Sequence, residues 1–200
     1  MPNKSSAWKE PYRLAIEESK RFLGREGEFE RESWVVARLL QAIGVPFQQH
    51  QFEDADEPVD VAFVDARFQI KELMESDRRR GDELKENLRK LKDAASEVDL
   101  LERYTPKDIS FSDVVAKTLS KAEKLEEVGY GPSERHFLDL LCYFNYLDYS
   151  VIPPFDFDTV RSSFRSISIV SNTYCGVIFV SEQAPNFLRS KLGRFEMITE

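Results

Sequence analysis

The sequence is poor in the residues that build cross-linked, fibrous or membrane-spanning proteins. Its 200 residues include only two cysteines, two histidines, eight glycines and nine prolines. Two cysteines make no disulfide framework, and so few glycines and prolines exclude a collagen-like or low-complexity chain. The most apolar run, residues 137–147, is interrupted by Asp139 and is shorter than the ~20 residues that a membrane span needs. We therefore expect no membrane association and, with no apolar leader at the start, a reducing cytoplasmic location.

What is present suits a folded, acidic protein. Hydrophobic residues make up 42% of the chain and charged residues 32%, which is enough to build a core. The formal net charge is −8. Proteins that bind nucleic acid through bulk charge are usually basic, because neutralising phosphates supplies most of their affinity. A nucleic-acid function would therefore require a local basic patch or a bound cation.

The hydrophobic pattern predicts an α/β (α+β) domain with a small mixed sheet flanked by helices. Helices are expected over 8–23, from about 28 to 43, from 133 to 147 and near 186–192. Strands are expected over 59–64, 67–73, 167–170, 176–180 and 195–198. Residues 82–128 have a helical pattern throughout and favour an αα-hairpin arm. We thus expect one domain over 1–200 with 82–128 as a helical-arm insertion, through which a homodimer would form.

The two strand-like runs on either side of residues 65–66 form the segment with the most informative pattern. A tight turn at 65–66 would place Asp60 opposite Lys71, and strand side chains alternate between the two faces. Asp60, Gln69 and Lys71 would then share one face within cross-strand reach, and any loop with an even number of residues keeps this result. An ordinary cross-strand ion pair between Asp60 and Lys71 is the alternative interpretation.

The helix that ends near residue 43 adds a further acid. At 100° per residue, Glu32 lies within about 40° of the apolar stripe that contains Val36 and Leu39. A carboxylate aimed at a sheet is costly unless it is hydrogen-bonded, paired or bound to metal. A simple preference of acids for the first turn of a helix is the alternative.

A helix glutamate, then a strand aspartate, then a strand ending in acid-x-Lys resembles the core of the PD-(D/E)xK nuclease superfamily. The corresponding segments here are 28–32, 58–63 and 68–72. The whole chain also resembles a small bacterial family of uncharacterised, endonuclease-like proteins, DUF1780. These resemblances imply a restriction-endonuclease-like core and an enzyme that hydrolyses phosphodiester bonds in DNA.

The superfamily resemblance also implies roles for individual residues. It implies Mg²⁺ or Mn²⁺ as cofactor, Asp60, Gln69 and Glu32 as metal ligands, and Lys71 as the catalytic lysine beside them. Gln69 departs from the acidic pattern, and a neutral amide oxygen would bind the cation more weakly. Phosphates would be contacted by four arginines, Arg67, Arg78, Arg79 and Arg80, although the run 78–80 is also typical of a solvated helix entry.

Other chemistries have weaker support. Neither histidine lies in a recognisable nucleophile or zinc motif, and no glycine-rich phosphate loop is present. The aromatic residues between 143 and 149 are interpreted as core or interface rather than as a base-stacking platform. A non-catalytic protein on the same scaffold, binding a protein or nucleic acid or dimerising, is the alternative function.

Overall fold

A computed structural model describes residues 7–75, 78, 80–101, 105–128, 130–146 and 148–197. The chain divides into two compact units. Unit 1 contains Met1–Arg31 and Glu75–Thr105, and unit 2 contains Glu32–Met74 and Pro106–Glu200. Whether the two units act as the single domain expected from the sequence stays a prediction.

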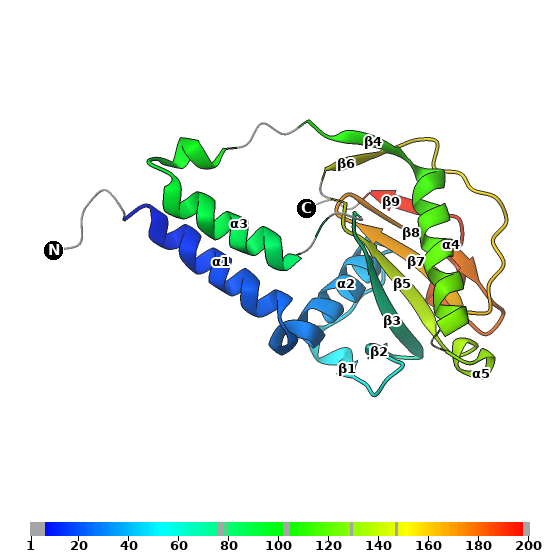
Figure 1. Cartoon of the computed structure of the whole chain (residues 1–200). Coiled ribbons are helices and arrows are strands. Elements are labelled where there is room, and N and C mark those ends of the chain that lie inside the picture. The colour runs from blue at the N-terminus through cyan, green and yellow to red at the C-terminus, as the bar shows by residue number, and fades with distance from the viewer. Residues whose placement is uncertain are drawn as a thin grey trace. The chain divides into compact units, whose positions relative to one another are not determined.

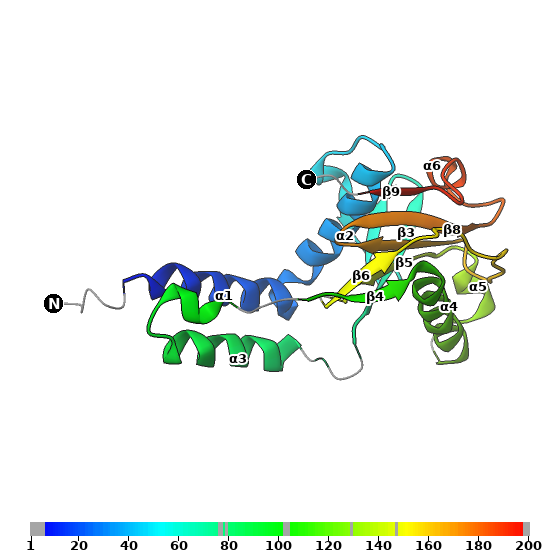
Figure 2. The ribbon, with the colours of Figure 1, turned by 90° about the horizontal axis from the view of Figure 1, so that it is seen from above.

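Unit 1 is a pair of helices. α1 (Lys9–Leu23) and α3 (Arg80–Asp93) lie side by side and antiparallel (Figures 1 and 2). The Lys9 ammonium at the start of α1 donates to the carbonyl of Lys92 at the end of α3, at 2.8 Å. Unit 1 also contains two short 3₁₀ turns, η2 (Arg25–Gly27) and η4 (Glu97–Leu100). The helix expected over 8–23 is confirmed.

Unit 2 is built on a seven-stranded sheet with the order β1-β2-β3-β5-β7-β8-β9. The strands are β1 (Phe52–Asp54), β2 (Val61–Phe63), β3 (Ala66–Leu73), β5 (Asp139–Phe144), β7 (Ser166–Ser171), β8 (Tyr174–Val180) and β9 (Phe195–Met197). β3, β5 and β7 run parallel in the middle, and the remaining pairings are antiparallel. A second sheet pairs β4 (Lys107–Ser110) with β6 (Tyr149–Ile152) in parallel. The expected α+β class with a mixed sheet is confirmed.

Two long helices cover opposite faces of the large sheet (Figure 2). α2 (Glu28–Ala42) places Trp34 edge-on against Tyr143 of β5, with ring centroids 5.6 Å apart. α4 (Phe111–Val128) packs on the other face, where its apolar residues join Leu140 and Cys142 of β5 in the main core. Shorter helical turns are η3 (Gln49–Gln51), α5 (Pro132–Arg135) and α6 (Asn186–Arg189). Within the described residues, no helix is both long and apolar enough to cross a membrane.

The turn between β2 and β3 lies one residue earlier than expected. Phe63 pairs with Ala66, so that the two-residue turn is Val64-Asp65, and Val64 has a positive φ of 55°. A β-branched residue rarely adopts this conformation, and sequence rules therefore place Val64 in the strand. Asp60 lies just before the paired residues of β2, and its hydrogen bonds go to Phe68, Gln69 and Ile70, so that it lies beside Gln69 rather than opposite Lys71.

The helix expected over 133–147 is wrong. Among the described residues of this range, helix is confined to Pro132–Arg135, and Asp139–Phe144 is a central strand of the sheet. A strand buried on both faces has a nearly continuous apolar sequence, and periodicity alone does not separate such a run from a buried helix.

The helical pattern expected throughout 82–128 is also wrong in part. Strand β4 lies between α3 and α4 and leads directly into α4 (Figure 1). Moreover, α3 belongs to unit 1 and α4 to unit 2. A homodimer through this segment stays a prediction.

Candidate functional site

Asp60, Gln69 and Lys71 meet on the α4 face of the β2–β3 hairpin. The backbone N–H of Asp60 donates to the carbonyl of Phe68 at 2.8 Å, which ties the residue before β2 to β3. One carboxylate oxygen of Asp60, Oδ2, accepts the backbone N–H of Ile70 at 2.6 Å and the side-chain amide of Gln69. Lys71 lies close enough for its charge to act on the same carboxylate. The structure thus brings together three of the four residues expected to form the site.

Tyr130 extends this group from a distant part of the chain. Its hydroxyl donates to Oε1 of Gln69, whose side chain is fully buried. The guanidinium of Arg135 holds the Tyr130 carbonyl at 2.5 Å and the carbonyl of Glu126 in α4 at 3.1 Å. Tyr130 is therefore fixed in position, and Gln69 is hydrogen-bonded at both ends of its amide. No local pattern in the sequence links Tyr130 to a residue 61 positions earlier.

We call Asp60, Gln69, Lys71 and Tyr130 the hairpin group. The pKa values of its two titratable oxygens, on Asp60 and Tyr130, are raised. Burial raises the pKa of Asp60, while the Ile70 N–H, the Lys71 ammonium and the Gln69 amide act in the opposite direction. The carboxylate of Glu57 raises the pKa of Asp60 further. Burial, followed by the charges of Glu57 and Asp60, raises the pKa of Tyr130. Glu57, which the sequence analysis did not single out, is thus a second acid near the group.

The donor set can be tested against a hard cation. Within the described part of the chain, no group of three or more histidine, cysteine, aspartate or glutamate side chains is placed to hold a metal ion. Mg²⁺, however, is often held by one or two carboxylates, with waters and substrate phosphate completing its shell. Oδ1 of Asp60 has no hydrogen-bond partner among the described residues, whereas the oxygen of Gln69 is taken by Tyr130.

A half-turn of the Gln69 amide would make the set fit. Its oxygen would then face Asp60, and its N–H would face the hydroxyl of Tyr130, which can accept as well as donate. Two oxygens, one charged and one neutral, would thereby point at the same space. Only in that turned orientation would Asp60 and Gln69 offer two oxygens to a divalent cation, and the binding of such a cation stays a prediction.

The comparisons with known proteins bear on this geometry. The profile of a family described as "Putative endonuclease, protein of unknown function (DUF1780)" matches residues 10–199. The chain belongs to the DUF1780 family. A search of curated proteins finds no match.

One solved structure shares the fold of this DUF1780 member. It is described as a protein of unknown function, PA4535, from Pseudomonas aeruginosa strain PAO1, of the monooxygenase superfamily. The two chains are 24% identical, the alignment covers 98% of this chain and 97% of that one, and the TM-score is 0.63. At this identity the likeness establishes the fold alone.

The fourth expected site residue of this DUF1780 protein, Glu32, has a different placement. It lies half-buried on α2, the helix that packs on the Trp34–Tyr143 face of the sheet, whereas the hairpin group lies on the α4 face. Its role as a metal ligand stays a prediction.

The four expected phosphate-binding arginines differ in their surroundings. The Arg67 side chain is exposed on the hairpin. Arg78 is paired with Glu75 at 3.3 Å and also with Glu83, and its side chain is only 15% exposed. Arg79 and the side chain of Arg80 lie outside the described residues. Phosphate binding by these arginines stays a prediction.

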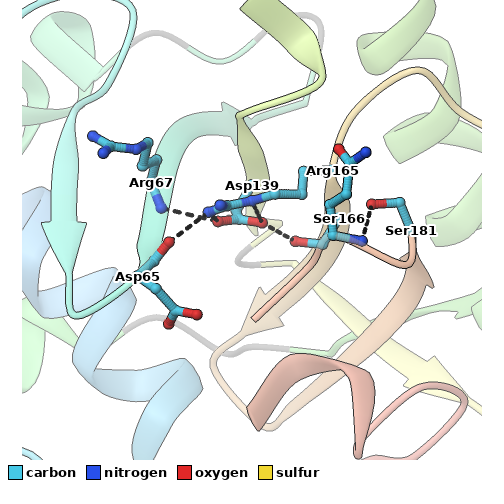
Figure 3. A network of polar contacts seen from close by, with 7 residues as sticks. Asp65, Arg67, Asp139, Arg165, Ser166 and Ser181 are labelled. Carbon is cyan, nitrogen blue, oxygen red and sulfur yellow. Dashed lines mark hydrogen bonds and ion pairs between the residues drawn. The ribbon is translucent and has the colours of Figure 1, made fainter. Parts of the chain in front are cut away.

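A second polar network lies at the start of the central strands, where Asp139 is fully buried (Figure 3). Its carboxylate accepts from the Arg165 guanidinium, the Ser166 hydroxyl at 2.7 Å and the Arg67 backbone N–H at 2.9 Å. Arg165 also donates to the Asp65 carbonyl at 2.9 Å, in the β2–β3 turn. Because protein donors surround the carboxylate of Asp139, we do not interpret it as a ligand-binding site. The network instead fixes the β2–β3 turn to the start of the central strands.

Proposed function

We propose that the protein is a metal-dependent nuclease of the PD-(D/E)xK type that hydrolyses phosphodiester bonds in DNA. One observation carries the proposal: an acid, an amide oxygen and an ammonium lie on one face of a β-hairpin, in the order Asp60, Gln69, Lys71. The family description, which names an endonuclease, supports the same reaction class.

Each residue of the hairpin group has a distinct task in this proposal. Asp60 supplies the charged oxygen for Mg²⁺ or Mn²⁺, and Gln69 supplies a neutral one after its amide turns. The bound cation supplies a polarised phosphate and a more acidic water. Lys71 makes no hydrogen bond or ion pair with the described residues, so its ammonium is available to hold the attacking water or the anionic transition state. Tyr130 positions Gln69 and does not touch the reacting atoms.

One observation favours the non-catalytic alternative. The Gln69 amide donates to Asp60 and so occupies the space that a second acidic ligand would leave open for a cation. If the amide does not turn, the scaffold retains the hairpin geometry without a metal site. Metal binding and cleavage must therefore be measured separately.

Metal binding is tested by calorimetric titration with Mn²⁺. We expect the wild type to bind weakly and Asp60→Asn to lose binding. Gln69→Glu should bind at least 10-fold more tightly, because it replaces a neutral oxygen with a charged one. Equal heats in the wild type and Asp60→Asn would remove Asp60 from the metal site, and an unchanged affinity in Gln69→Glu would remove Gln69.

Catalysis is tested by nicking of supercoiled plasmid with Mg²⁺ or Mn²⁺. We expect Lys71→Met to lower the rate by roughly 10²–10³-fold, the usual cost of removing a group that stabilises transition-state charge. Lys124→Met is a matched control, because Lys124 is an exposed lysine of α4. Equal rates for wild type and Lys71→Met would assign the activity to another site or to a contaminant.

A further inference from the structure

Four lysines of unit 2 form a row that begins at the hairpin group. One is on β3, two are on α4 and one is on β4. Lys71 is the Cα partner of Cys142 on the adjacent strand β5. The ammonium groups of Lys71 and Lys121 both act on the buried Cys142 thiol; burial raises its pKa to about 12, and the two charges oppose that rise. Lys71 is thus beside Cys142 in the sheet, and Lys121 of α4 lies near enough to Cys142 for its charge to act on the thiol.

The row of lysines continues along α4 to the second sheet, which pairs β4 with β6. Lys117 lies one helical turn before Lys121 and thus on the same side of α4. Its ammonium is 5.6 Å from the ring centroid of Tyr146, and that ring is 5.4 Å from the ring of Tyr149. The ammonium of Lys107 on β4 lies 5.5 Å from the centroid of the Tyr149 ring. We call Lys71, Lys121, Lys117 and Lys107 the lysine strip.

The aromatic rings orient the lysines rather than offering a stacking surface. Tyr146 is already stacked on Phe144, with ring centroids 4.1 Å apart. Cation–π contacts hold the ammonium groups of Lys117 and Lys107 over the rings of Tyr146 and Tyr149. This fits contacts to a charged backbone and not to base faces.

The four lysines of the strip also lack ion pairs with carboxylates in the described residues, although the charge of Lys71 acts on Asp60. The protein has a net charge of −8, so a row of ammonium groups without ion pairs beside the hairpin group is unexpected. A polyanion that brings its own negative charges would account for it.

We propose that the lysine strip binds the phosphate backbone of a DNA strand and leads it to the hairpin group. The binding of DNA to the lysine strip does not depend on the proposed function. That the bound DNA strand leads to the hairpin group does rest on it. From the level of Lys71 to the end of β5 at Phe144 the sheet rises by two residues, about 7 Å at ~3.3 Å per residue, and Tyr146 follows two residues later in the chain. The sheet part of this path alone corresponds to about two nucleotides at the ~3.4 Å rise of a B-form strand. Because the contacts are to phosphates, binding should depend on salt and not on base sequence.

The test is fluorescence anisotropy with a labelled 20-base-pair duplex and the matching single strand, without divalent cations. The variant is Lys107→Met with Lys117→Met, both exposed lysines that are not part of the hairpin group. Lys191→Met with Arg194→Met is the matched control. Lys191 acts on Cys175, which lies on the opposite face of the sheet, and Arg194 is exposed nearby.

We expect the strip variant to bind roughly 10- to 100-fold more weakly at 0.1 M salt. Its slope of log affinity against log salt should be shallower by about 1.8, which is two lost phosphate contacts at ~0.9 each. The control variant should match the wild type in both, and circular dichroism should show that both variants are folded.

Several outcomes overturn the proposal. They are equal losses in the two variants, no loss in the strip variant, no DNA binding by the wild type, and strip-dependent binding to phosphatidylserine vesicles in place of DNA. Binding through the strip without any cleavage would refute the proposed function and leave the strip established. Cleavage that is equally fast in wild type and strip variant would support the proposed function and refute the role of the strip.

Discussion

Basic residues have different surroundings in the two units. In unit 1, Arg13 is paired with Glu10 at 2.6 Å and Glu17 at 2.8 Å, all on α1. On α3, Arg89 is paired in the same way with Glu86 at 2.6 Å and Asp93 at 3.4 Å. In unit 2, the lysine strip carries four ammonium groups without a carboxylate partner in the described residues. Arg13 and Arg89 of unit 1 are thus matched by acids of their own helices, whereas the four lysines of the strip in unit 2 have no such ion pair in the described residues.

The units differ equally in how they bury polar groups. Unit 2 encloses the ion pair between Asp139 and Arg165 in its sheet, and it buries Gln69 completely. In unit 1, α1 has no buried residue, and the pairs of its arginine are exposed. The comparison therefore predicts that polar substitutions cost much in unit 2 and little in unit 1. The two tryptophans allow a direct test, because Trp8 belongs to unit 1 and Trp34 to unit 2.

The largest effect is expected at Asp139. Asp139→Ala leaves the buried Arg165 guanidinium without its carboxylate and should cost about 3–5 kcal/mol of unfolding free energy. The measurement is urea unfolding of unit 2, followed by Trp34 fluorescence in a Trp8→Phe background.

A double variant keeps this prediction testable if Asp139→Ala does not fold. Replacing both partners, Asp139→Leu with Arg165→Met, removes the charge as well as its partner and should be less destabilising than Asp139→Ala. A double variant that is less stable than the single one would show that the ion pair itself stabilises the sheet.

The sequence predicted the elements whose patterns are local. The helix over 8–23 and the strands near 167–170 and 176–180 have short, unambiguous periods, and the structure confirms them. Strand β5 was misassigned because its two faces are both buried, one under α2 and one under α4. Its buried acid, Asp139, was read as an interruption, although it is the centre of the network with Arg165.

In the hairpin, the predicted face of each side chain is right although the predicted register is wrong. The turn was placed one residue too late, because nothing in the sequence marks Val64 for a positive φ. The side-chain alternation nevertheless placed Asp60, Gln69 and Lys71 on one face, since both turns contain two residues. Tyr130 was missed because its contact with Gln69 depends on where α4 ends in space, which no local pattern encodes.

The second-largest effect is expected at Tyr130. Tyr130→Phe removes the hydroxyl that donates to the buried oxygen of Gln69, and an unsatisfied buried acceptor costs about 1–3 kcal/mol. The loss should be visible by Trp34 fluorescence in the same background. Tyr149→Phe is the matched control, because its ring packs on Tyr146 and no hydrogen bond of its hydroxyl is found in the described residues. Equal losses in the two variants would contradict a specific role for the Tyr130 hydroxyl.

A smaller effect concerns pH. Because burial raises the pKa of Asp60 above its ordinary 3.8, the folded protein holds this proton more tightly than the unfolded chain. The stability that protonated Asp60 contributes is fully present below the ordinary value, and it is lost as pH rises through the higher folded value. Asp60→Asn lacks this loss, so it should be more stable than the wild type at neutral pH, with the difference shrinking toward pH 4. A constant difference across that range, in thermal melts from pH 4 to 8, would contradict the raised pKa.

The smallest effect is expected in unit 1. Arg13→Ala and Arg89→Ala each remove pairs between exposed side chains, whose attraction is screened by water and salt. Both variants should keep the wild-type urea midpoint within error, followed by Trp8 fluorescence in a Trp34→Phe background, and neither should alter DNA affinity. A clear loss of stability that persists at 1 M NaCl would mean that these arginines do more than balance their own helices. The contrast between matched and unmatched charge would then no longer separate the two units.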